Sequence, residues 1–165
     1  MLIGLSGCGK STVGAPLSRR LKMLFVDMDS YIVRKEGKSV REIFAQNGEA
    51  YFRARETEAA KNLSECGGKV IATGGGVVLN PRNIEYLKQN GIVVFLDRTP
   101  DEILKKINLE IRPLLAEKKE KLYEMDAARR PLYEQSANLT VRGSASVAET
   151  AEKLEKALKP FLEQN

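Results

Sequence analysis

The chain has 165 residues, of which 42% are hydrophobic and 30% charged, and its formal net charge is +5 at pH 7. This length predicts a single domain, residues 1–165, and is too short for a catalytic domain joined to a regulatory one. Because the sequence contains no histidine, a Ser-His-Asp triad and a histidine-ligated metal are excluded. No apolar run approaches the about 20 residues of a membrane span, and we expect no membrane contact and no signal peptide.

The pattern of apolar runs and turn residues predicts strands that alternate with helices along the chain. The runs at 1–5, 23–26, 70–73, 92–96 and 139–141 predict five strands, the second of them buried. Helical patterns cover 10–22, 29–66 with breaks at Gly37 and near Gly48, 81–89, 100–107, from about 122 to 137, and from 146 onward. Short apolar strands separated by helices are typical of a parallel sheet that is covered on both faces.

The distribution of basic residues and the number of cysteines indicate which partners and which cellular compartment to expect. The basic side chains are dispersed among acidic ones and are not interleaved with aromatic residues, so we expect no nucleic-acid partner. The two cysteines, Cys8 and Cys66, are predicted to be free thiols, which indicates a cytoplasmic protein.

Residues 4–11 form a complete G-x-x-x-x-G-K-[ST] phosphate-binding loop between an apolar run and a helix. In such a loop, backbone N–H groups surround phosphate oxygens and the helix N-terminus adds the positive end of its dipole. A chance glycine-rich turn is the alternative, but the flanking strand and helix favour a nucleoside triphosphate site. Lys10 is expected to reach the β- and γ-phosphates, and Ser11 to bind Mg²⁺. The residues expected to contact ATP are Gly7, Cys8, Gly9, Lys10, Ser11 and Thr12.

Two acidic residues, Asp27 and Asp29, follow the second predicted strand. Ligands of open α/β sheets bind at the carboxyl ends of the strands, where the phosphate loop also lies. One carboxylate is therefore predicted to hold Mg²⁺ and the other to face the hydroxyl that accepts the phosphate. Helix capping is the alternative role for either residue.

Three consecutive glycines, residues 74–76, follow the third predicted strand. As a structural feature they would form a tight turn that requires a positive φ. As a functional feature they would let a small substrate approach bare backbone N–H groups, and we favour this second interpretation.

Taken together, these blocks resemble the shikimate kinases over residues 1 to about 155. The matching blocks, in chain order, are Asp27-Met28-Asp29, Ile43-Phe44-x-x-x-Gly48-Glu49-x-x-Phe52-Arg53-x-x-Glu56, Thr73-Gly74-Gly75-Gly76, Arg112-Pro113-Leu114 and Arg129-x-Pro131-Leu132-Tyr133. The resemblance implies a three-layer α/β/α P-loop kinase fold with a five-stranded parallel sheet and a mobile lid. It also implies ATP- and Mg²⁺-dependent phosphorylation of the 3-hydroxyl of shikimate, on the pathway to the aromatic amino acids, by a monomer.

The resemblance also implies roles for individual residues. Asp29 would hold the shikimate hydroxyls and help to deprotonate the attacking one, while Arg53 and Arg129 would clamp the shikimate carboxylate. Asp27 would act beside Ser11 at the metal. The catalytic residues implied are Asp29, Lys10 and Arg112, and the other substrate contacts are Gly74, Gly75, Gly76, Phe44, Phe52 and Glu56, mostly within a substrate-binding region at about 29–60.

The nucleotide side departs from the family pattern in two places. Lys105 stands where many members carry an arginine that stacks on adenine, and the loop at 142–146 is short and lacks a proline. The details of base recognition are therefore left open. The charged stretch at about 108–120 matches the lid, from which Arg112 would reach ATP; its lysines are otherwise typical of a solvated helix face.

Other functions fit the residues less well. A kinase for another hydroxylated acid, such as gluconate, gives no reason for Arg53, the three glycines and Arg129 to occur together. A nucleoside monophosphate kinase needs a pocket for a second base and more phosphate-clamping arginines in its lid. An inactive nucleotide-binding regulator would be expected to have lost Lys10, Asp29 or one of the substrate arginines, and all are present. Cys8 leaves two possibilities open, because its place in the phosphate loop favours a reactive thiolate whereas burial there would leave it inert.

Overall fold

The structure is a computed structural model that describes the backbone of residues 1–105 and 112–163, and the side chains of 1–105 and 119–163. The strands are β1 (Leu2–Ile3), β2 (Leu24–Asp27), β3 (Lys69–Ala72), β4 (Val94–Asp97) and β5 (Leu139–Arg142). The helices are α1 (Lys10–Arg20), α2 (Met28–Glu36), α3 (Val40–Ser64), the 3₁₀ turn η1 (Val77–Leu79), α4 (Pro81–Gln89), α5 (Pro100–Leu104), α6 (Arg112–Ser136) and α7 (Val147–Leu162).

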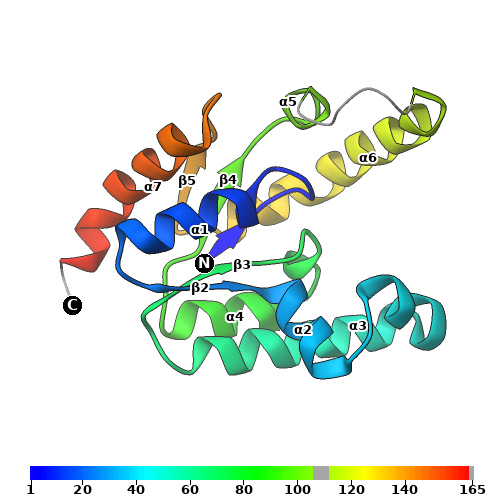
Figure 1. The fold of residues 1–165 in the computed structure, drawn as a ribbon, viewed down its shortest axis with the longest axis horizontal. Coiled ribbons are helices and arrows are strands. Elements are labelled where there is room, and N and C mark those ends of the chain that lie inside the picture. The colour runs from blue at the N-terminus through cyan, green and yellow to red at the C-terminus, as the bar shows by residue number, and fades with distance from the viewer. Residues whose placement is uncertain (106–111, 164–165) are drawn as a thin grey trace.

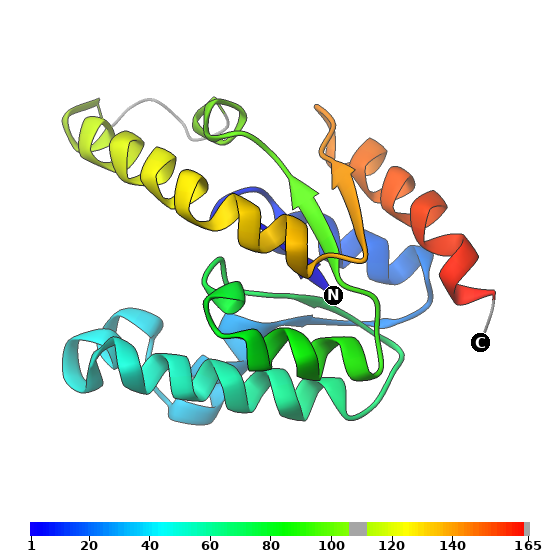
Figure 2. The ribbon, with the colours of Figure 1, turned by 180° about the vertical axis from the view of Figure 1, so that it is seen from behind.

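The five strands form one sheet in the order β2-β3-β1-β4-β5, and every pair is parallel. In Figures 1 and 2, α1 and α7 lie on one face of the sheet and α3, α4 and α6 on the other. The predicted three-layer fold with a five-stranded parallel sheet is therefore confirmed. Because all strands run the same way, their carboxyl ends meet at one edge, where the phosphate loop leaves β1.

Two helix boundaries place the acidic and basic residues of the site. Asp27 caps α2 by accepting from the backbone N–H of Ser30, and Gly37 ends the helix in the left-handed conformation with a φ of 66°. Helix α3 begins with a capping box between Ser39 and Glu42. It is interrupted at Gly48, where φ is 80° and ψ is 172°, as the predicted break implies.

The second strand differs from the prediction. Although Leu24-Phe25-Val26 is an apolar run, none of its residues is fully buried, and Leu24 is 69% exposed. The reason is position, because β2 is an edge strand and pairs with β3 alone. Helix α6 also begins about ten residues earlier than predicted, so a helix occupies much of the charged stretch.

The core is built around the inner strands. Phe95 of β4 stacks on Tyr133 of α6 with ring centroids 5.2 Å apart, and both side chains are buried. This contact fixes the end of α6 against the middle of the sheet. Among the helices that the structure describes, none is long and apolar enough to span a membrane.

Candidate active site

The phosphate loop is closed by its own backbone and by Lys10. Gly7 and Gly9 have φ values of 80° and 97°, which residues with a Cβ rarely adopt. The Lys10 ammonium donates to the carbonyl oxygens of Gly4 at 2.7 Å and Leu5 at 2.9 Å. The lysine predicted to bind phosphate is therefore held directly at the loop and is largely buried.

The first turn of α1 is open toward solvent. Gly9 is its N-cap and supplies no side chain to the free N–H groups of the turn, while Ser11 and Thr12 are exposed. Free N–H groups at a helix start attract anions. Cys8 differs from its neighbours, because it is only 1% exposed and its sulfur lies 3.7 Å from the Lys10 Nζ atom. Burial of the thiol favours the inert alternative.

Asp27 caps a helix and also contacts Ser11. Its Oδ1 atom caps α2 at 2.9 Å from the Ser30 nitrogen. Its Oδ2 atom accepts a hydrogen bond from the Ser11 hydroxyl, so the two residues predicted to hold the metal are in contact. One carboxylate and one hydroxyl are the hard oxygen ligands that Mg²⁺ takes when phosphates and water complete its shell. The described residues contain no group of three or more acidic or cysteine side chains that would form a closed metal cage.

Asp29 lies two residues after Asp27, half-buried in the first turn of α2. Burial raises the pKa of its carboxyl group, the neighbouring Asp27 raises it further, and Lys10 and Arg53 oppose the shift. The Oδ1 atom is buried without a hydrogen-bond partner. A carboxylate oxygen kept free in this way is suited to accept a proton or a hydroxyl from a ligand.

Arg53 is held from two sides by acidic residues of its own helix, α3. It donates to Glu56 at 2.8 Å and to Glu49 at 3.2 and 3.3 Å, the spacing of successive helical turns. Glu56 is only 1% exposed, and its pKa is raised by burial, an effect that Arg53 partly opposes. The second Glu56 oxygen has no partner, so this buried carboxylate is half-satisfied.

Aromatic rings form one side of the same region. The rings of Phe44 and Phe52 lie 4.8 Å apart, and the Arg53 guanidinium stands over the Phe52 ring at 5.5 Å. Phe52 is buried, whereas Phe44 is partly exposed. The rings can therefore pack against an apolar surface of a ligand whose charged group faces Arg53.

Each of the three glycines after β3 is in close contact with a different site residue. A Cβ on Gly74 would lie 3.0 Å from both Asp29 Oδ1 and Glu56 Oε1. One on Gly75 would lie 2.5 Å from the Ser6 hydroxyl of the phosphate loop, and one on Gly76 would lie 2.6 Å from the Arg53 Cζ atom. The segment is a turn, closed by a hydrogen bond from the Val77 N–H to the Gly74 carbonyl oxygen at 3.3 Å, but none of the three glycines has the positive φ that the structural interpretation required. A side chain on any of these glycines would clash, because the turn packs between the phosphate loop on one side and Asp29, Glu56 and Arg53 on the other.

Helix α6 contributes Arg129 and Tyr133. The Arg129 guanidinium lies close enough to Glu56 and Tyr133 to lower the pKa of each, although burial dominates and raises that of Tyr133 to about 12. The Tyr133 hydroxyl donates to the Gly75 carbonyl oxygen at 2.5 Å. Tyr133 was part of a matching block but received no role from the sequence. The only signal was a tyrosine one turn after Arg129.

The nucleotide side is described only in part. Lys105 ends α5 and its side chain is exposed, so it is free to meet a ligand. Arg112 is the first residue of α6, but its side chain, like most of the predicted lid, lies outside the described residues. The loop after β5 is fastened by buried Arg98, which donates to the Ser144 carbonyl oxygen at 2.8 Å. No role was predicted for Arg98.

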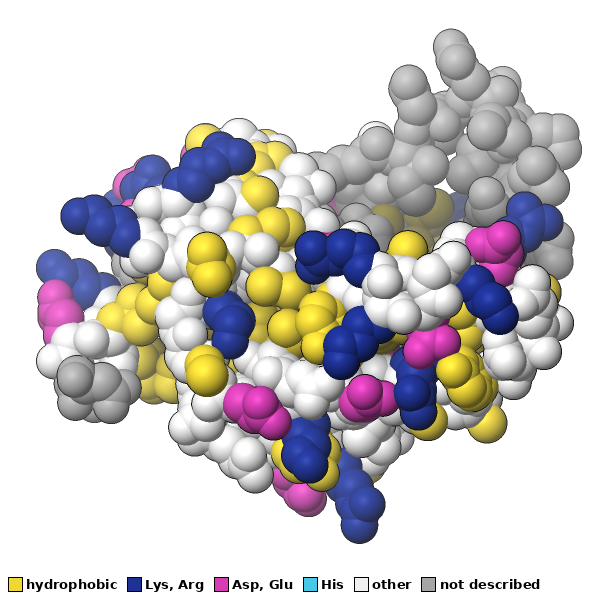
Figure 3. Space-filling model, turned by 60° about the horizontal axis from the view of Figure 1, so that its bottom comes forward, with side chains coloured by type: hydrophobic (Ala, Val, Ile, Leu, Met, Phe, Trp, Pro, Cys, Tyr) yellow, Lys and Arg dark blue, Asp and Glu magenta, His cyan; other side chains and the backbone are white. Residues whose placement is uncertain are grey.

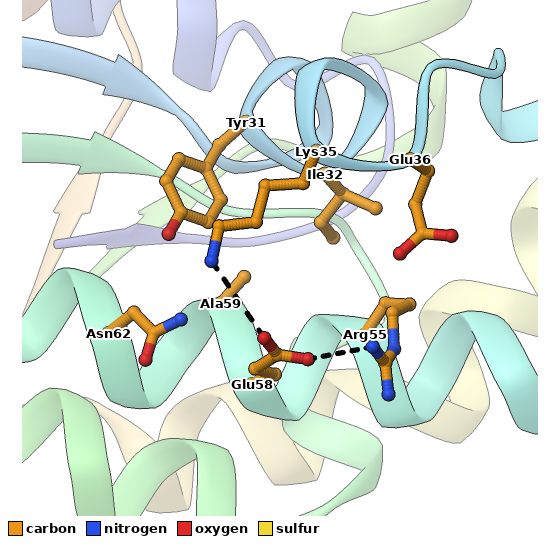
Figure 4. A pocket seen from close by; sticks show the side chains of 8 residues that line it. All are labelled: Tyr31, Ile32, Lys35, Glu36, Arg55, Glu58, Ala59 and Asn62. Carbon is orange, nitrogen blue, oxygen red and sulfur yellow. Dashed lines mark ion pairs between the residues drawn. The ribbon is translucent and has the colours of Figure 1, made fainter.

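One further hollow lies outside this cluster. Figure 4 shows it between α2 and α3, lined by Tyr31, Ile32, Lys35, Glu36, Arg55, Glu58, Ala59 and Asn62. Its volume is about 10 Å³, room for no more than a water molecule, and Glu58 is paired with Arg55 at 2.9 Å and with Lys35 at 3.8 Å. This hollow is a contact between two helices and not a ligand site.

Comparison with known proteins agrees with this geometry. The family model for shikimate kinase matches residues 6–159, which is nearly the whole chain. The chain belongs to the shikimate kinase family. Members of the family transfer a phosphoryl group from ATP to shikimate, and the protein is therefore a phosphotransferase of aromatic amino acid biosynthesis.

Individual relatives extend this match over the full length. The shikimate kinase of Clostridium botulinum (strain Alaska E43 / Type E3) is 41% identical over 95% of this chain and 94% of its own. A solved shikimate kinase from Acinetobacter baumannii, in complex with shikimate, is 35% identical with a TM-score of 0.86, covering 99% of this chain and 92% of that one. The enzyme from Aquifex aeolicus is 36% identical with a TM-score of 0.79, covering 98% and 96%.

Proposed function

We propose that this protein phosphorylates the 3-hydroxyl of shikimate with ATP, and that the cluster between the phosphate loop, α2, α3 and α6 carries the reaction. In the transfer, the hydroxyl oxygen forms a bond to the γ-phosphorus, the bond from that phosphorus to the β,γ-bridging oxygen breaks, and ADP leaves. The hydroxyl proton passes to Asp29. The observation that supports this best is the unpartnered Asp29 Oδ1 atom beside Gly74, at the edge of the sheet where the phosphate loop begins.

Asp29 has the properties of a proton acceptor at this place. Burial and Asp27 raise its pKa, which increases its basicity, while Lys10 and Arg53 keep the charged form accessible. A carboxylate whose oxygen already accepted a protein hydrogen bond would be a poorer base. Because phosphoryl transfer depends more on position and charge than on covalent steps, one oriented carboxylate is sufficient.

The substrate carboxylate is proposed to bind between Arg53 and Arg129. Glu56 pairs with Arg53 at 2.8 Å and so orients it, Arg129 lies near enough to lower the pKa of Glu56, and the second Glu56 oxygen stays unpaired. Two planar guanidinium groups can bind a carboxylate through parallel pairs of hydrogen bonds. Phe44 and Phe52 would pack against the ring of the substrate. The turn at residues 74–76 would contact the substrate through its backbone, because glycine has no side chain.

The phosphates are proposed to bind at the first turn of α1, with Lys10 turning from the loop carbonyls to the β- and γ-phosphates. Ser11 and Asp27 fit Mg²⁺, since both present oxygen atoms and lie in contact. The ion, when bound, supplies charge neutralisation on the phosphate oxygens. Arg112 and Lys105 are proposed to complete the ATP contacts, within one domain that acts as a cytoplasmic monomer and closes its lid, at about 108–120, over the site.

A coupled assay for ADP tests the proposal. With ATP, Mg²⁺ and shikimate, ADP should form, and omitting shikimate or replacing it by gluconate should abolish most of the signal. Asp29→Asn should lower kcat by about 10²–10⁴-fold without changing the Mg²⁺ requirement, whereas Asp27→Asn should raise the Mg²⁺ concentration for half activity. Asp101→Asn, which removes an exposed acid that accepts from Tyr123, is the matched control. ADP release that does not depend on shikimate would refute the proposal.

A further inference from the structure

Ser6 of the phosphate loop has two hydrogen-bond donors without a partner among the described residues, its hydroxyl and its backbone N–H. The side chain is also exposed. The hydroxyl of Ser11, by contrast, already donates to Asp27. Two free donors on one residue of a phosphate-binding loop are suited to an anion that enters from solvent.

Ser6 stands at the junction between the phosphate loop and the acceptor site. A Cβ on Gly75 would lie 2.5 Å from the Ser6 Oγ atom and 3.0 Å from the Ser6 nitrogen, so both donors are close to the glycine turn. On the neighbouring Gly74, a Cβ would lie 3.0 Å from the unpartnered Asp29 Oδ1 atom. The free donors of Ser6 and the free acceptor of Asp29 therefore contact two consecutive glycines.

The Lys10 ammonium is held next to Ser6 within the loop. It donates at 2.9 Å to the carbonyl oxygen of Leu5, which belongs to the peptide group that links Leu5 to Ser6. Lys10 also lies close enough to Asp29 to oppose the rise in the pKa of that carboxyl group. The lysine proposed to bind phosphate and the proposed base therefore lie on either side of Ser6. A γ-phosphoryl group that moves from the nucleotide to the acceptor passes this residue.

The face of the molecule that Figure 3 brings forward is less suited to a phosphate. Among the described residues on that face, basic side chains are scattered and several lie beside acidic ones. Single exposed charges of this kind are weakened by salt and water. At the phosphate loop, free donors and the largely buried Lys10 are collected in one place.

We propose that Ser6 is a catalytic residue whose hydroxyl donates a hydrogen bond to the γ-phosphoryl group and holds it in line between ADP and the acceptor hydroxyl. This role rests on the proposed function. Ser6 keeps its proton, and no bond to its oxygen forms or breaks, because the phosphoryl group passes from ADP to the acceptor and the acceptor proton passes to Asp29. In-line positioning and charge stabilisation are the main contributions a protein makes to phosphoryl transfer.

Ser6→Ala tests this role in the full chain. Alanine fits beside Gly75 but cannot donate, so only the hydrogen bond is removed. With saturating shikimate, kcat/KM for ATP should fall by about 10- to 100-fold, since the bond is to a charged group. The KM for shikimate should change by less than about twofold, and the melting temperature by less than about 2 °C. Ser136→Ala, at the far end of α6, is the matched control.

A binding experiment separates the contact with the γ-phosphoryl group from a general effect on the loop. Beryllium fluoride takes the place of this group beside bound ADP, and it should tighten the binding of ADP to the original chain. In Ser6→Ala this gain should shrink by about tenfold or more, while the affinity for ADP alone should change by less than about twofold. Calorimetric titrations with Mg²⁺ and ADP, with and without beryllium fluoride, measure both affinities.

Three results would overturn the role of Ser6. The first is an unchanged kcat/KM for ATP in Ser6→Ala, and the second is a loss of affinity for ADP alone as large as the loss with beryllium fluoride. The third is a phosphate found on Ser6 by mass spectrometry after incubation with ATP, because the hydroxyl would then be a nucleophile. If the original chain forms no ADP that depends on shikimate, the proposed function fails instead, and the fluoride titration still decides the contact of Ser6.

Discussion

The Tyr133 hydroxyl and the Gly75 carbonyl oxygen are joined by a hydrogen bond of 2.5 Å. This bond links the end of α6, which carries Arg129, to the glycine turn that packs against Asp29 and Arg53. The two arginines proposed to hold the substrate carboxylate come from helices far apart in the sequence. The Tyr133 bond connects the helix that carries Arg129 directly to the turn that packs against Arg53.

Replacing Tyr133 by phenylalanine should therefore loosen the acceptor site. The loss of one buried hydrogen bond should lower the free energy of unfolding by about 0.5–1.5 kcal/mol. The KM for shikimate should rise by about three- to tenfold, while the KM for ATP should change by less than about twofold. Tyr123→Phe removes a hydroxyl that donates to Asp101 outside the site and is the control. Equal changes in both KM values would contradict this role.

Gly76→Ala should disturb the acceptor site through Arg53. The new methyl group would lie 2.6 Å from the Arg53 Cζ atom, so the guanidinium has to move. We expect the KM for shikimate to rise by about tenfold or more, with ATP binding retained. Gly67→Ala is the matched control, because no atom lies within 4 Å of the added Cβ. If Gly76→Ala has the kinetics of the original chain, Arg53 is not positioned by this contact.

The two proposed carboxylate ligands can be tested by truncation. Arg53→Ala and Arg129→Ala should each weaken the use of shikimate, measured by kcat/KM, by about 2–5 kcal/mol. Arg55→Ala provides a control on the same helix as Arg53, because Arg55 pairs with Glu58 at the hollow between α2 and α3. A comparable loss of ATP affinity in either variant would assign that arginine to the nucleotide or to the fold.

The buried carboxyl group of Glu56 should leave a signature in the pH dependence of stability. Because burial raises its pKa in the folded protein, folding favours the protonated form. The stability it contributes is complete below its ordinary pKa of 4.5 and is lost as the pH rises through the raised value. The stability of Glu56→Gln relative to the original chain should therefore increase from pH 4 upward, as thermal melts can measure.

Glu42 supplies a control of opposite sign. Its hydrogen bonds with Ser39 lower its pKa, so the stability it contributes is present at neutral pH and is lost as the pH falls. Glu42→Gln should consequently cost most near pH 7 and least in acid. The same pH trend for both variants would contradict the assigned causes.

The cysteines should differ in reactivity. Cys66 is exposed and should react first with a thiol reagent, whereas Cys8 is buried within the phosphate loop. Enzyme labelled at one thiol should remain active, and Cys8→Ser should also be active. Mass spectrometry after brief labelling can count and locate the adducts. Rapid inactivation that ATP slows would instead support the reactive Cys8 that its place beside Lys10 suggested.

Much of the fold followed from local signals. Pro81 and Asn90 bounded α4 correctly, and the breaks at Gly37 and Gly48 were correct because both need a backbone conformation that favours glycine. The exposure of Leu24 could not be predicted, since it depends on strand order and not on the run itself. The phosphate loop was visible because its chemistry lies in consecutive residues.

The remaining features of the site depend on contacts between distant segments. Three glycines in a row suggested a turn or a bare surface, but their reason lies in Ser6, Asp29 and Arg53, which reach them from other elements. Tyr133 was likewise indistinguishable from an ordinary core tyrosine until its partner Gly75 was known. Contacts of this kind have no local pattern in the sequence.

Ser6 of the phosphate loop touches Gly75, which is itself held by Tyr133 and flanked by the residues of the acceptor site. A change in the loop on nucleotide binding would therefore be felt at the acceptor site across a single contact. Thermodynamic reciprocity then requires that the factor by which ATP changes the affinity for the acceptor equals the factor by which the acceptor changes the affinity for ATP. Because Gly75 has no side chain, the phosphate loop and the acceptor site are in direct contact, and the binding of one ligand can change the affinity for the other.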